Sequence, residues 1–192
     1  MATIIKPEIF AEGNALTWAP SLLGKILVRT QADGVTTRHL IAETEAYNGE
    51  NDLACHACRG RTARTEVMYR PGGLWYVYLC YGMHEMLNLV VGPEGFPAAV
   101  LIRGLHDVSG PGRLTKRLGI GRALNGRLAE PAIGLHLEDD GLRVSKKWIQ
   151  TMPRIGVAYA GPVWSLKPWR HVIAPAWPPL ASLMTPPAHR PR

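Results

Sequence analysis

The stretch RHLIAETEAYNG (residues 38–49), followed by PGGLWYVYLCYGMHEMLN (residues 71–88), decides how this chain folds. The first segment is predicted to pair with residues 25–31, because Asp33-Gly34 between the two is a strong β-hairpin signal. In the second segment, aromatic and β-branched residues predict a strand that ends at Gly82 and returns as a second hairpin. The chain is therefore organised around two hairpins separated by a basic loop.

The flanking segments supply further elements. Residues 14–23 predict a short helix, which Pro20 weakens, and residues 98–103 predict an apolar strand that ends in the lone charge of Arg103. Residues 109–120 have the punctuation of a helix, with Ser109 as its expected N-cap. The other expectations are a loop with a short helical piece over residues 48–70 and a pairing of residues 135–137 with residues 142–144.

Length and composition indicate one globular domain. A chain of 192 residues is long enough to bury a core, and a hydrophobic content of 46% excludes wholesale disorder. No apolar run reaches the length of a membrane span, and the first residues show no secretory pattern. Three cysteines are a poor basis for a disulfide framework, so we expect a protein of the reducing cytoplasm, associated with the nucleoid in a prokaryote.

The chain is basic, with a formal net charge of +7 and a pI of about 9.6. Such a charge attracts polyanions through counterion release at phosphates. Many soluble proteins are basic for no specific purpose, so the charge alone favours nucleic acid only modestly.

Glu43 and Glu45 are the first candidates for chemistry. Side chains alternate along a strand, so both carboxylates project from one face, with their Cα atoms about 7 Å apart. A buried acid at this place could activate water as a general base. Glutamates on a solvated strand face are equally ordinary, and the spacing leaves both interpretations open.

The aromatic residues of the second hairpin are candidates for stacking. Tyr76 and Tyr78 share one face of their strand, while Trp75 and Tyr81 share the other. Each ring can contribute about 1–3 kcal/mol by stacking on a nucleic-acid base, although aromatic strand residues more often fill a core. Tyr81 is the exception, because its place beside Gly82 at a turn offers little core to fill.

Two further clusters carry weaker signals. Cys55, His56 and Cys58 suggest zinc, but four ligands are usual and no second pair follows, so we expect no metal and reduced, structural cysteines. The start of the helix at residues 109–120 suits a phosphate. A solvated basic helix face explains the same residues equally well.

The most specific signal is a set of six segments in a fixed order. They are ETEAY at residues 43–47, His56, YVYLCYGM at residues 76–83 with Asn88, VLIRG at residues 100–104, SGPGRL at residues 109–114 and RIGVAYAG at residues 154–161. Together they resemble the 3-methyladenine DNA glycosylases of the alkyladenine (methylpurine) type. The resemblance covers the chain from residue 22 to about residue 177.

The resemblance implies an α+β fold. A single domain over residues 1–180 would contain a curved, mostly antiparallel β-sheet surrounded by helices, with one protruding β-hairpin. Residues 181–192 are rich in proline and are expected to form a mobile tail. The implied activity is DNA repair: a monomer that flips a damaged purine out of double-stranded DNA and hydrolyses its N-glycosidic bond without a cofactor or a membrane.

The resemblance also assigns the site residues. Glu45 would be the general base, facing a hole large enough for a purine, and Arg103 would help to hold the attacking water. The pocket would consist of Tyr47 and Tyr78, which stack on the base, His56, which contacts its edge, and Asn88, which excludes the amino group of guanine. Tyr81 would enter the minor groove as a wedge, and the other expected DNA contacts are Met83, Arg64, Arg113 and Lys116. Residues 154–161 would add secondary contacts.

The chain departs from the family pattern at Glu85 and at Ala63-Arg64-Thr65, which bears on DNA contacts more than on chemistry. No lysine is placed for Schiff-base attack, so we predict a monofunctional glycosylase that does not cleave the strand. The sequence does not choose among 3-methyladenine, 7-methylguanine, hypoxanthine and ethenoadenine. Two alternatives stay open: a hydrolase of small glycosides that uses Glu43 and Glu45 together, and a non-catalytic basic nucleic-acid-binding module.

Overall fold

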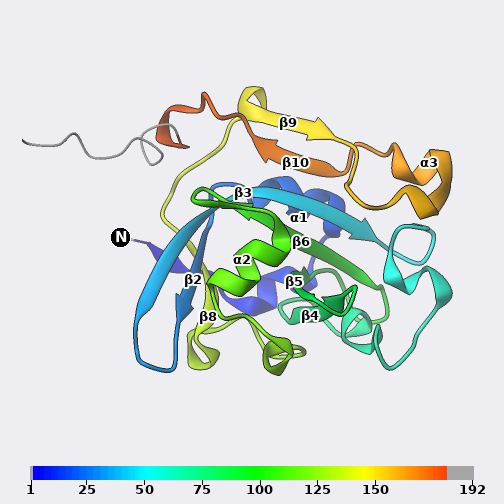
Figure 1. The fold of residues 1–192 in the computed structure, drawn as a ribbon, viewed down its shortest axis with the longest axis horizontal. Coiled ribbons are helices and arrows are strands. Elements are labelled where there is room, and N and C mark those ends of the chain that lie inside the picture. Colours follow the sequence, from blue (N-terminus) through cyan, green and yellow to red (C-terminus); the bar gives the residue numbers. More distant parts are fainter. Residues whose placement is uncertain (1, 181–192) are drawn as a thin grey trace, which may run out of the picture.

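Strand β3 (Thr36–Asn48) is the centre of the fold and spans 13 residues. Its first half pairs with β2 (Ile26–Thr30), as the turn signal predicts, and its second half pairs with β6 (Ala98–Leu105). The register between β3 and β6 shifts around Glu43, and a bulge of this kind bends a strand. Figure 1 accordingly shows β3 as a long arc across the molecule.

Ten strands form one sheet in the computed structural model, which describes residues 2–180. The strand order is β1-β8-β2-β3-β6-β5-β4, while β10 pairs with β3 and β9, and β7 pairs with β6. The remaining strands are β1 (Thr3–Ile4), β4 (Trp75–Cys80), β5 (His84–Val90), β7 (Val108–Ser109), β8 (Leu135–Asp139), β9 (Ile149–Met152) and β10 (Arg170–Ile173). These strands pair antiparallel, which confirms the predicted α+β class and its mostly antiparallel sheet.

Short helices cover the sheet. Helix α1 (Ala15–Ser21) packs against β3 and β6, α2 (Pro111–Arg117) packs against β5 and β6, and α3 (Gly161–Ser165) lies beyond β9 (Figure 1). The 3-10 helices are Pro7–Ala11, His56–Arg59, Glu66–Tyr69, Arg122–Leu124, Pro131–Ile133, Lys146–Trp148 and Ala158–Ala160. Within residues 2–180, no helix combines the length and apolar character that crossing a membrane requires.

Helix α1 fixes the back of β3. Asn14 caps it, because the Asn14 side chain accepts hydrogen bonds from the amides of the next turn. At the other end, where helical carbonyls lack partners, the carbonyl of Ala19 accepts a hydrogen bond of 2.8 Å from the Thr44 hydroxyl. Thr44 lies between Glu43 and Glu45, so this bond holds the part of β3 that carries both carboxylates.

The core separates the aromatic residues of the second hairpin into two environments. Trp75 is fully buried with Ile41 and Leu87, and its indole nitrogen donates to a carbonyl of β8. A second, smaller cluster contains buried Tyr76, with Tyr78 only partly buried at its edge. Trp75 is therefore a core residue, whereas Tyr78 lies where another molecule can reach it.

Two local predictions are wrong. Residues 142–144 do not pair with β8, because β1 and β2 are the partners of β8. Ser109 is not the cap of α2, because it pairs with Gly104 in β7, and Gly110 is the capping residue. The φ of Gly110 is 96°, a conformation that favours glycine, so the helix begins after it. The expected tail at residues 181–192 lies outside the described residues.

Candidate active site

Glu45 lies in β3 with no exposed surface. Its Oε2 accepts a hydrogen bond of 2.9 Å from the Tyr47 hydroxyl, and its Oε1 accepts one of 2.9 Å from the Ile155 amide. Arg103 Nε lies 3.5 Å from Oε1. Burial raises the pKa of Glu45 above its usual value, and the three neighbouring donors oppose that rise. Such a carboxylate can take a proton from a water molecule that reaches it.

Glu43 projects to the same side, as predicted, but its environment differs. Its Oε1 accepts hydrogen bonds of 2.9 Å from both Arg103 Nε and Arg170 Nη1. Glu43 therefore anchors two arginines, and Arg103 is bound to Glu43 more closely than to Glu45. One ion-paired and one proton-accepting carboxylate do not form the matched pair that a two-acid glycoside hydrolase uses.

Tyr47 is held from behind by a buried ion pair. The guanidinium of Arg154 lies 4.8 Å from the centre of the Tyr47 ring. Arg154 is bound to Asp52 by two hydrogen bonds of 2.6 and 2.8 Å, and neither of these two side chains is exposed. Burial raises the pKa of Tyr47 well above its usual value, so its hydroxyl keeps its proton and donates to Glu45.

Two tyrosines, a histidine and an arginine form the outer wall of the site. The Tyr78 ring lies 4.5 Å from the His56 ring and 5.3 Å from the Tyr76 ring, and His56 Nδ1 is 3.0 Å from the Tyr76 hydroxyl. The Arg64 guanidinium lies 5.0 Å from the Tyr78 ring and 3.4 Å from His56 Nε2. Burial and the charge of Arg64 lower the pKa of His56 to about 4, so this imidazole is neutral at pH 7.

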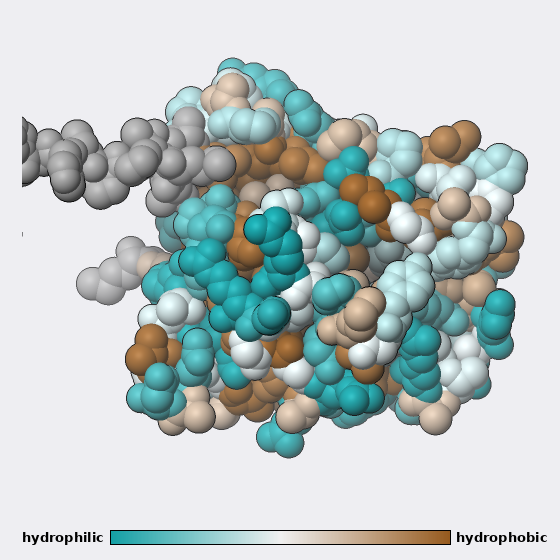
Figure 2. Space-filling model, viewed as in Figure 1, coloured by the Kyte–Doolittle hydropathy of each residue, from teal (hydrophilic) through white to brown (hydrophobic). Residues whose placement is uncertain are grey.

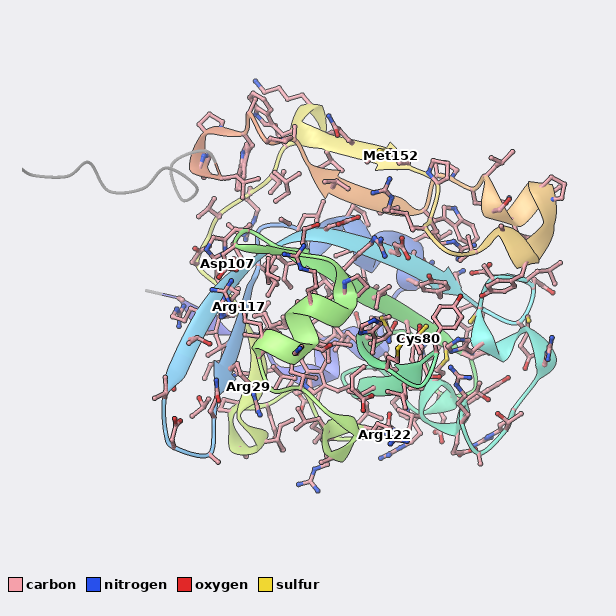
Figure 3. All side chains as sticks on the ribbon, viewed as in Figure 1. Arg29, Cys80, Asp107, Arg117, Arg122 and Met152 are labelled. Carbon is pink, nitrogen blue, oxygen red and sulfur yellow. The ribbon has the colours of Figure 1, made fainter. Side chains whose placement is uncertain are left out.

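The turn between β4 and β5 displays two large apolar side chains. Tyr81 is 84% exposed and Met83 is 73% exposed. Tyr81 has a φ of 50° and is the only non-glycine residue among residues 2–180 with a positive φ. Gly82 beside it has a φ of 70°. A left-handed tyrosine costs about 1–3 kcal/mol, and strain of this size is often found at functional sites. The turn follows Cys80, which Figure 3 labels.

At the two departures from the family pattern, the side chains of Glu85 and Thr65 have partners within the protein. Glu85 Oε1 lies 3.4 Å from Nε of Arg122, which Figure 3 labels. Thr65 is buried, and its hydroxyl accepts a hydrogen bond of 2.8 Å from the Thr62 amide. Glu85 is thus paired with a cation, and Thr65 stabilises the loop that carries Arg64.

Helix α2 brings basic side chains beside this hairpin. A Cβ atom on Gly112 would lie 2.9 Å from the His84 side chain, so α2 packs closely on the start of β5. Arg113 and Lys116 are exposed on this helix, and Figure 2 shows a largely hydrophilic surface there. The structure therefore brings the predicted phosphate contacts close to the predicted wedge.

Asn88 lies beneath the outer wall. It is buried opposite Tyr76 in the β4–β5 pairing, and its amide nitrogen donates to the Tyr76 carbonyl at 3.1 Å. Its predicted contact with the base edge stays a prediction.

Comparison with known proteins shows the family of this chain. The profile of the family described as Methylpurine-DNA glycosylase (MPG) matches residues 9–109 and 106–176. The chain belongs to this family. It is 47% identical over 174 residues to a protein of Myxococcus xanthus (85% of this chain, 87% of that protein) and 43% identical over 190 residues to one of Psychrobacter cryohalolentis (84% and 88%). A protein of Methanocella arvoryzae is 44% identical over 186 residues (86% and 90%), and all three names assign their proteins, provisionally, to the 3-methyladenine DNA glycosylases.

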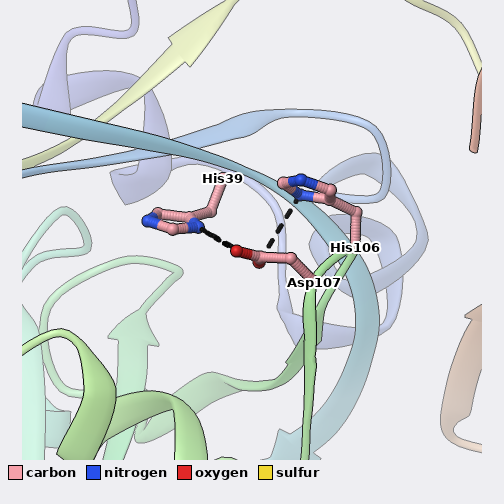
Figure 4. Close-up of side chains that lie close together, drawn as sticks. All are labelled: His39, His106 and Asp107. Carbon is pink, nitrogen blue, oxygen red and sulfur yellow. Dashed lines mark hydrogen bonds and ion pairs between the residues drawn. The ribbon is translucent and has the colours of Figure 1, made fainter. Parts of the chain in front are cut away.

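One cluster of side chains of the types that bind metals lies outside the candidate active site. Among residues 2–180, ligand atoms of His39, His106 and Asp107 lie within 4.8 Å of one another (Figure 4). His106 Nδ1 accepts the Leu40 amide, and the Asp107 carboxylate is bound to Arg117 at 2.8 Å. A cation would have to compete with that guanidinium, so the group is a poor metal site. Its hydrogen bonds and ion pairs instead join β3, the β6–β7 turn and α2.

The Cys55-His56-Cys58 run does not converge on a metal either, within the described part of the chain. Burial raises the pKa of the Cys55 thiol to about 12, so this sulfur is not the thiolate that binds metals. His56 is directed to Tyr76 and Arg64 instead.

Two residues near Glu45, Asp52 and Arg170, were not among the predicted site residues, whereas Arg154 and Ile155 belong to the segment 154–161 that was expected to add secondary contacts. Arg154 had a signal, because it is the only charge in an otherwise apolar, glycine-containing segment. Asp52 was one of several charges in a loop, and the donor at Ile155 is a backbone amide, which no residue type reveals.

Access to Glu45 is restricted in this conformation. The resemblance implies a purine-sized hole facing this carboxylate, but Glu45 has no exposed surface. The carboxylate does not point into bulk solvent, and the Tyr78 ring is only partly buried. Surface hollows elsewhere, such as one of about 460 Å³ lined by Pro162 and Leu166, do not include these residues.

Proposed function

We propose that this protein is a monofunctional DNA glycosylase that removes alkylated or deaminated purines, of the 3-methyladenine, 7-methylguanine and hypoxanthine class, from double-stranded DNA. The observation that carries the proposal is the buried, hydrogen-bonded carboxylate of Glu45 in a chain of the methylpurine-DNA glycosylase family. We further propose that it acts as a monomer in the cytoplasm. Cysteines that are all free are consistent with a reducing compartment.

Binding begins with the duplex backbone and the hairpin. Arg113 and Lys116 would contact phosphates, while Tyr81 and Met83 enter the minor groove. An apolar insert of this kind unstacks the base step and bends the duplex. Flipping a base costs a few kcal/mol, and less for a damaged or badly paired one, so lesions are extruded preferentially.

The flipped purine would stack on Tyr78 beside His56. The guanidinium of Arg64, a planar cation, lies over this ring in the free protein. A purine that takes this place displaces Arg64, which can then reach a DNA phosphate. Because His56 is neutral at pH 7, it can exchange a hydrogen bond with the base edge without adding charge to the pocket.

The chemistry centres on Glu45. Entry of the base beside Tyr47 and Tyr78 would bring a water molecule to the carboxylate. Glu45 takes one proton from this water, the water oxygen bonds to C1′, and the electrons of the broken C1′–N bond leave with the purine. The negative carboxylate also stabilises the oxocarbenium-like transition state. The products are a free base and an intact strand with an abasic site.

Release of free base from a duplex with one hypoxanthine or one alkylated adenine tests the proposal. The wild type should release the base, and the strand should break only after alkali treatment. Glu45→Gln should bind the duplex without releasing base. Salt-dependent binding without release by the wild type would favour the non-catalytic module. Strand cleavage by pure enzyme would contradict monofunctional chemistry, and hydrolysis of small glycosides lost equally in Glu43→Gln and Glu45→Gln would favour the small-glycoside hydrolase.

A further inference from the structure

We propose that Asp52 and Arg154 form a buried clamp that positions both the carboxylate of Glu45 and the ring of Tyr47. The proposal rests on the glycosylase function and names two positioning residues for it. Neither residue touches the reacting atoms; both act through their neighbours.

The clamp itself is an ion pair with a fixed geometry. The two forked hydrogen bonds of 2.6 and 2.8 Å define the plane of the guanidinium. Arg154 Nη1 also donates to the Ala46 carbonyl at 2.8 Å, and Nη2 donates to the Trp164 carbonyl at 3.3 Å. Arg154 thus joins β3, the loop after it and α3 at one point.

Fixing Arg154 fixes the donor on one oxygen of Glu45. Ile155 is the next residue in the chain, and its amide donates to Glu45 Oε1 at 2.9 Å. This hydrogen bond is the largest of the effects that oppose the rise of the Glu45 pKa on burial. A shift of the Arg154 backbone would therefore loosen the carboxylate and change its basicity.

The same guanidinium fixes the donor on the other oxygen. It lies 4.8 Å from the Tyr47 ring and 4.9 Å from the Trp169 ring, distances at which a cation is attracted to an aromatic face. The Tyr47 hydroxyl is bound to Glu45 Oε2. One buried cation thus supports the neighbours of both carboxylate oxygens.

A buried ion pair calls for an explanation beyond stability. The desolvation of two charges often cancels their attraction, and apolar replacements can be as stable. Asp52 completes its bonding with the amides of Asn48 and Ala54 at 3.2 and 3.1 Å, so the acid is held as firmly as the base. The location of this rigid pair behind Tyr47 and before Ile155 is what a positioning function requires.

Single-turnover base release with Arg154→Lys and Asp52→Asn tests the clamp. Lysine keeps the charge and loses the fork, while asparagine keeps the shape and loses the charge. Because misplacing a catalytic group by about 1 Å can cost about 100-fold, we expect a loss of that order in rate. Affinity for the duplex should stay at the wild-type level. The pH of half-maximal rate should rise, because the Ile155 amide no longer lowers the pKa of Glu45.

The pH midpoint also depends on the other charges near Glu45, which the variants must leave unchanged. The charged and titratable groups that face Glu45 are Glu43 and Tyr47 from β3, Arg103 from β6, Arg170 from β10 and Arg154 itself. Arg143→Lys is the matched control, because the Arg143–Asp139 ion pair is exposed (69% for Arg143) and lies outside the site. This control should keep the wild-type rate and midpoint.

The outcomes separate positioning from folding. Variants that unfold at a lower temperature but, when folded, keep the wild-type rate and pH midpoint would overturn the clamp. Should both fail to fold, Trp169→Leu removes one ring beside Arg154 and leaves the ion pair intact. It should lower the rate and raise the midpoint, less than Arg154→Lys would, and a wild-type rate and midpoint would overturn the clamp. No release by the wild type would overturn the glycosylase function and the clamp together, whereas full release by every variant would overturn the clamp alone.

Discussion

The site around Glu45, called here the inner site, and the hairpin tip at Tyr81 lie within 40 residues of each other in the chain but in opposite environments. Glu45 has no exposed surface and is hydrogen-bonded at both oxygens, whereas Tyr81 is 84% exposed and strained at φ 50°. The first environment fixes an acid and tunes its pKa. The second offers a ring to another molecule. The difference teaches that chemistry and DNA opening should be separable by substitution.

Glu45→Gln should have the largest effect. A general base contributes about 10²–10⁴-fold, so the single-turnover rate of base release should fall by that factor while duplex binding persists. Glutamine keeps the size of the side chain and can still accept the Ile155 amide. A variant with wild-type turnover would remove the inner site from the mechanism.

Tyr81→Ala should come next and should act on flipping. Losing the stacking of one ring costs about 1–3 kcal/mol, so release from a paired lesion should slow by roughly 5–150-fold. A lesion in single-stranded DNA should be affected much less, because it needs no wedge. Leu166→Ala removes another exposed apolar side chain (68%) elsewhere and should change the rate on neither substrate. Equal losses in Tyr81→Ala for both substrates would contradict the separation.

Glu43→Gln should chiefly affect stability. It weakens hydrogen bonds to Arg103 and Arg170, and hydrogen bonds to charged groups are worth about 1.5–3 kcal/mol. Urea denaturation should show a loss of that order in the free energy of unfolding. The rate of base release should fall far less than in Glu45→Gln. Equal rate losses in the two variants would revive the two-carboxylate mechanism.

Arg64→Ala should have the smallest effect and reports on the outer wall. The charge of Arg64 helps to lower the pKa of His56 to about 4, so its removal should raise that pKa. Burial, the larger cause, remains, so the pKa should stay below its usual value near 6.5. An NMR titration of the His56 ring measures this directly. An unchanged or lower pKa would place Arg64 away from the ring.

Local patterns predicted the frame of the site. The Asp33-Gly34 turn and the period of two placed both glutamates on one face of β3, and the turn at Gly82 predicted the exposure of Tyr81. These features depend on neighbours in the sequence, which a single chain displays.

Long-range contacts were beyond such patterns. The Asp52–Arg154 pair joins residues 102 positions apart, and the Ile155 amide reaches Glu45 across 110 positions. The bulge at Glu43 and the covering of Glu45 likewise arise from how β3 meets β6 and β10. The alternation of side chains along β3 did not distinguish Glu43 from Glu45 as the candidate general base. Only the packing around each carboxylate distinguishes them.

The pH–rate profile of single-turnover release tests the central claim most directly. A duplex with 7-methylguanine is suitable, because its alkylated ring is already cationic and needs no proton to leave. Glu45 must be ionised to act, and burial raises its pKa, so the rate should fall as the pH drops through a midpoint above 4.5. Below that midpoint the rate should fall by about tenfold for each pH unit. This acidic limb of the pH–rate profile should be absent in Glu45→Gln. A flat wild-type profile, or the same limb in Glu45→Gln, would contradict Glu45 as the general base.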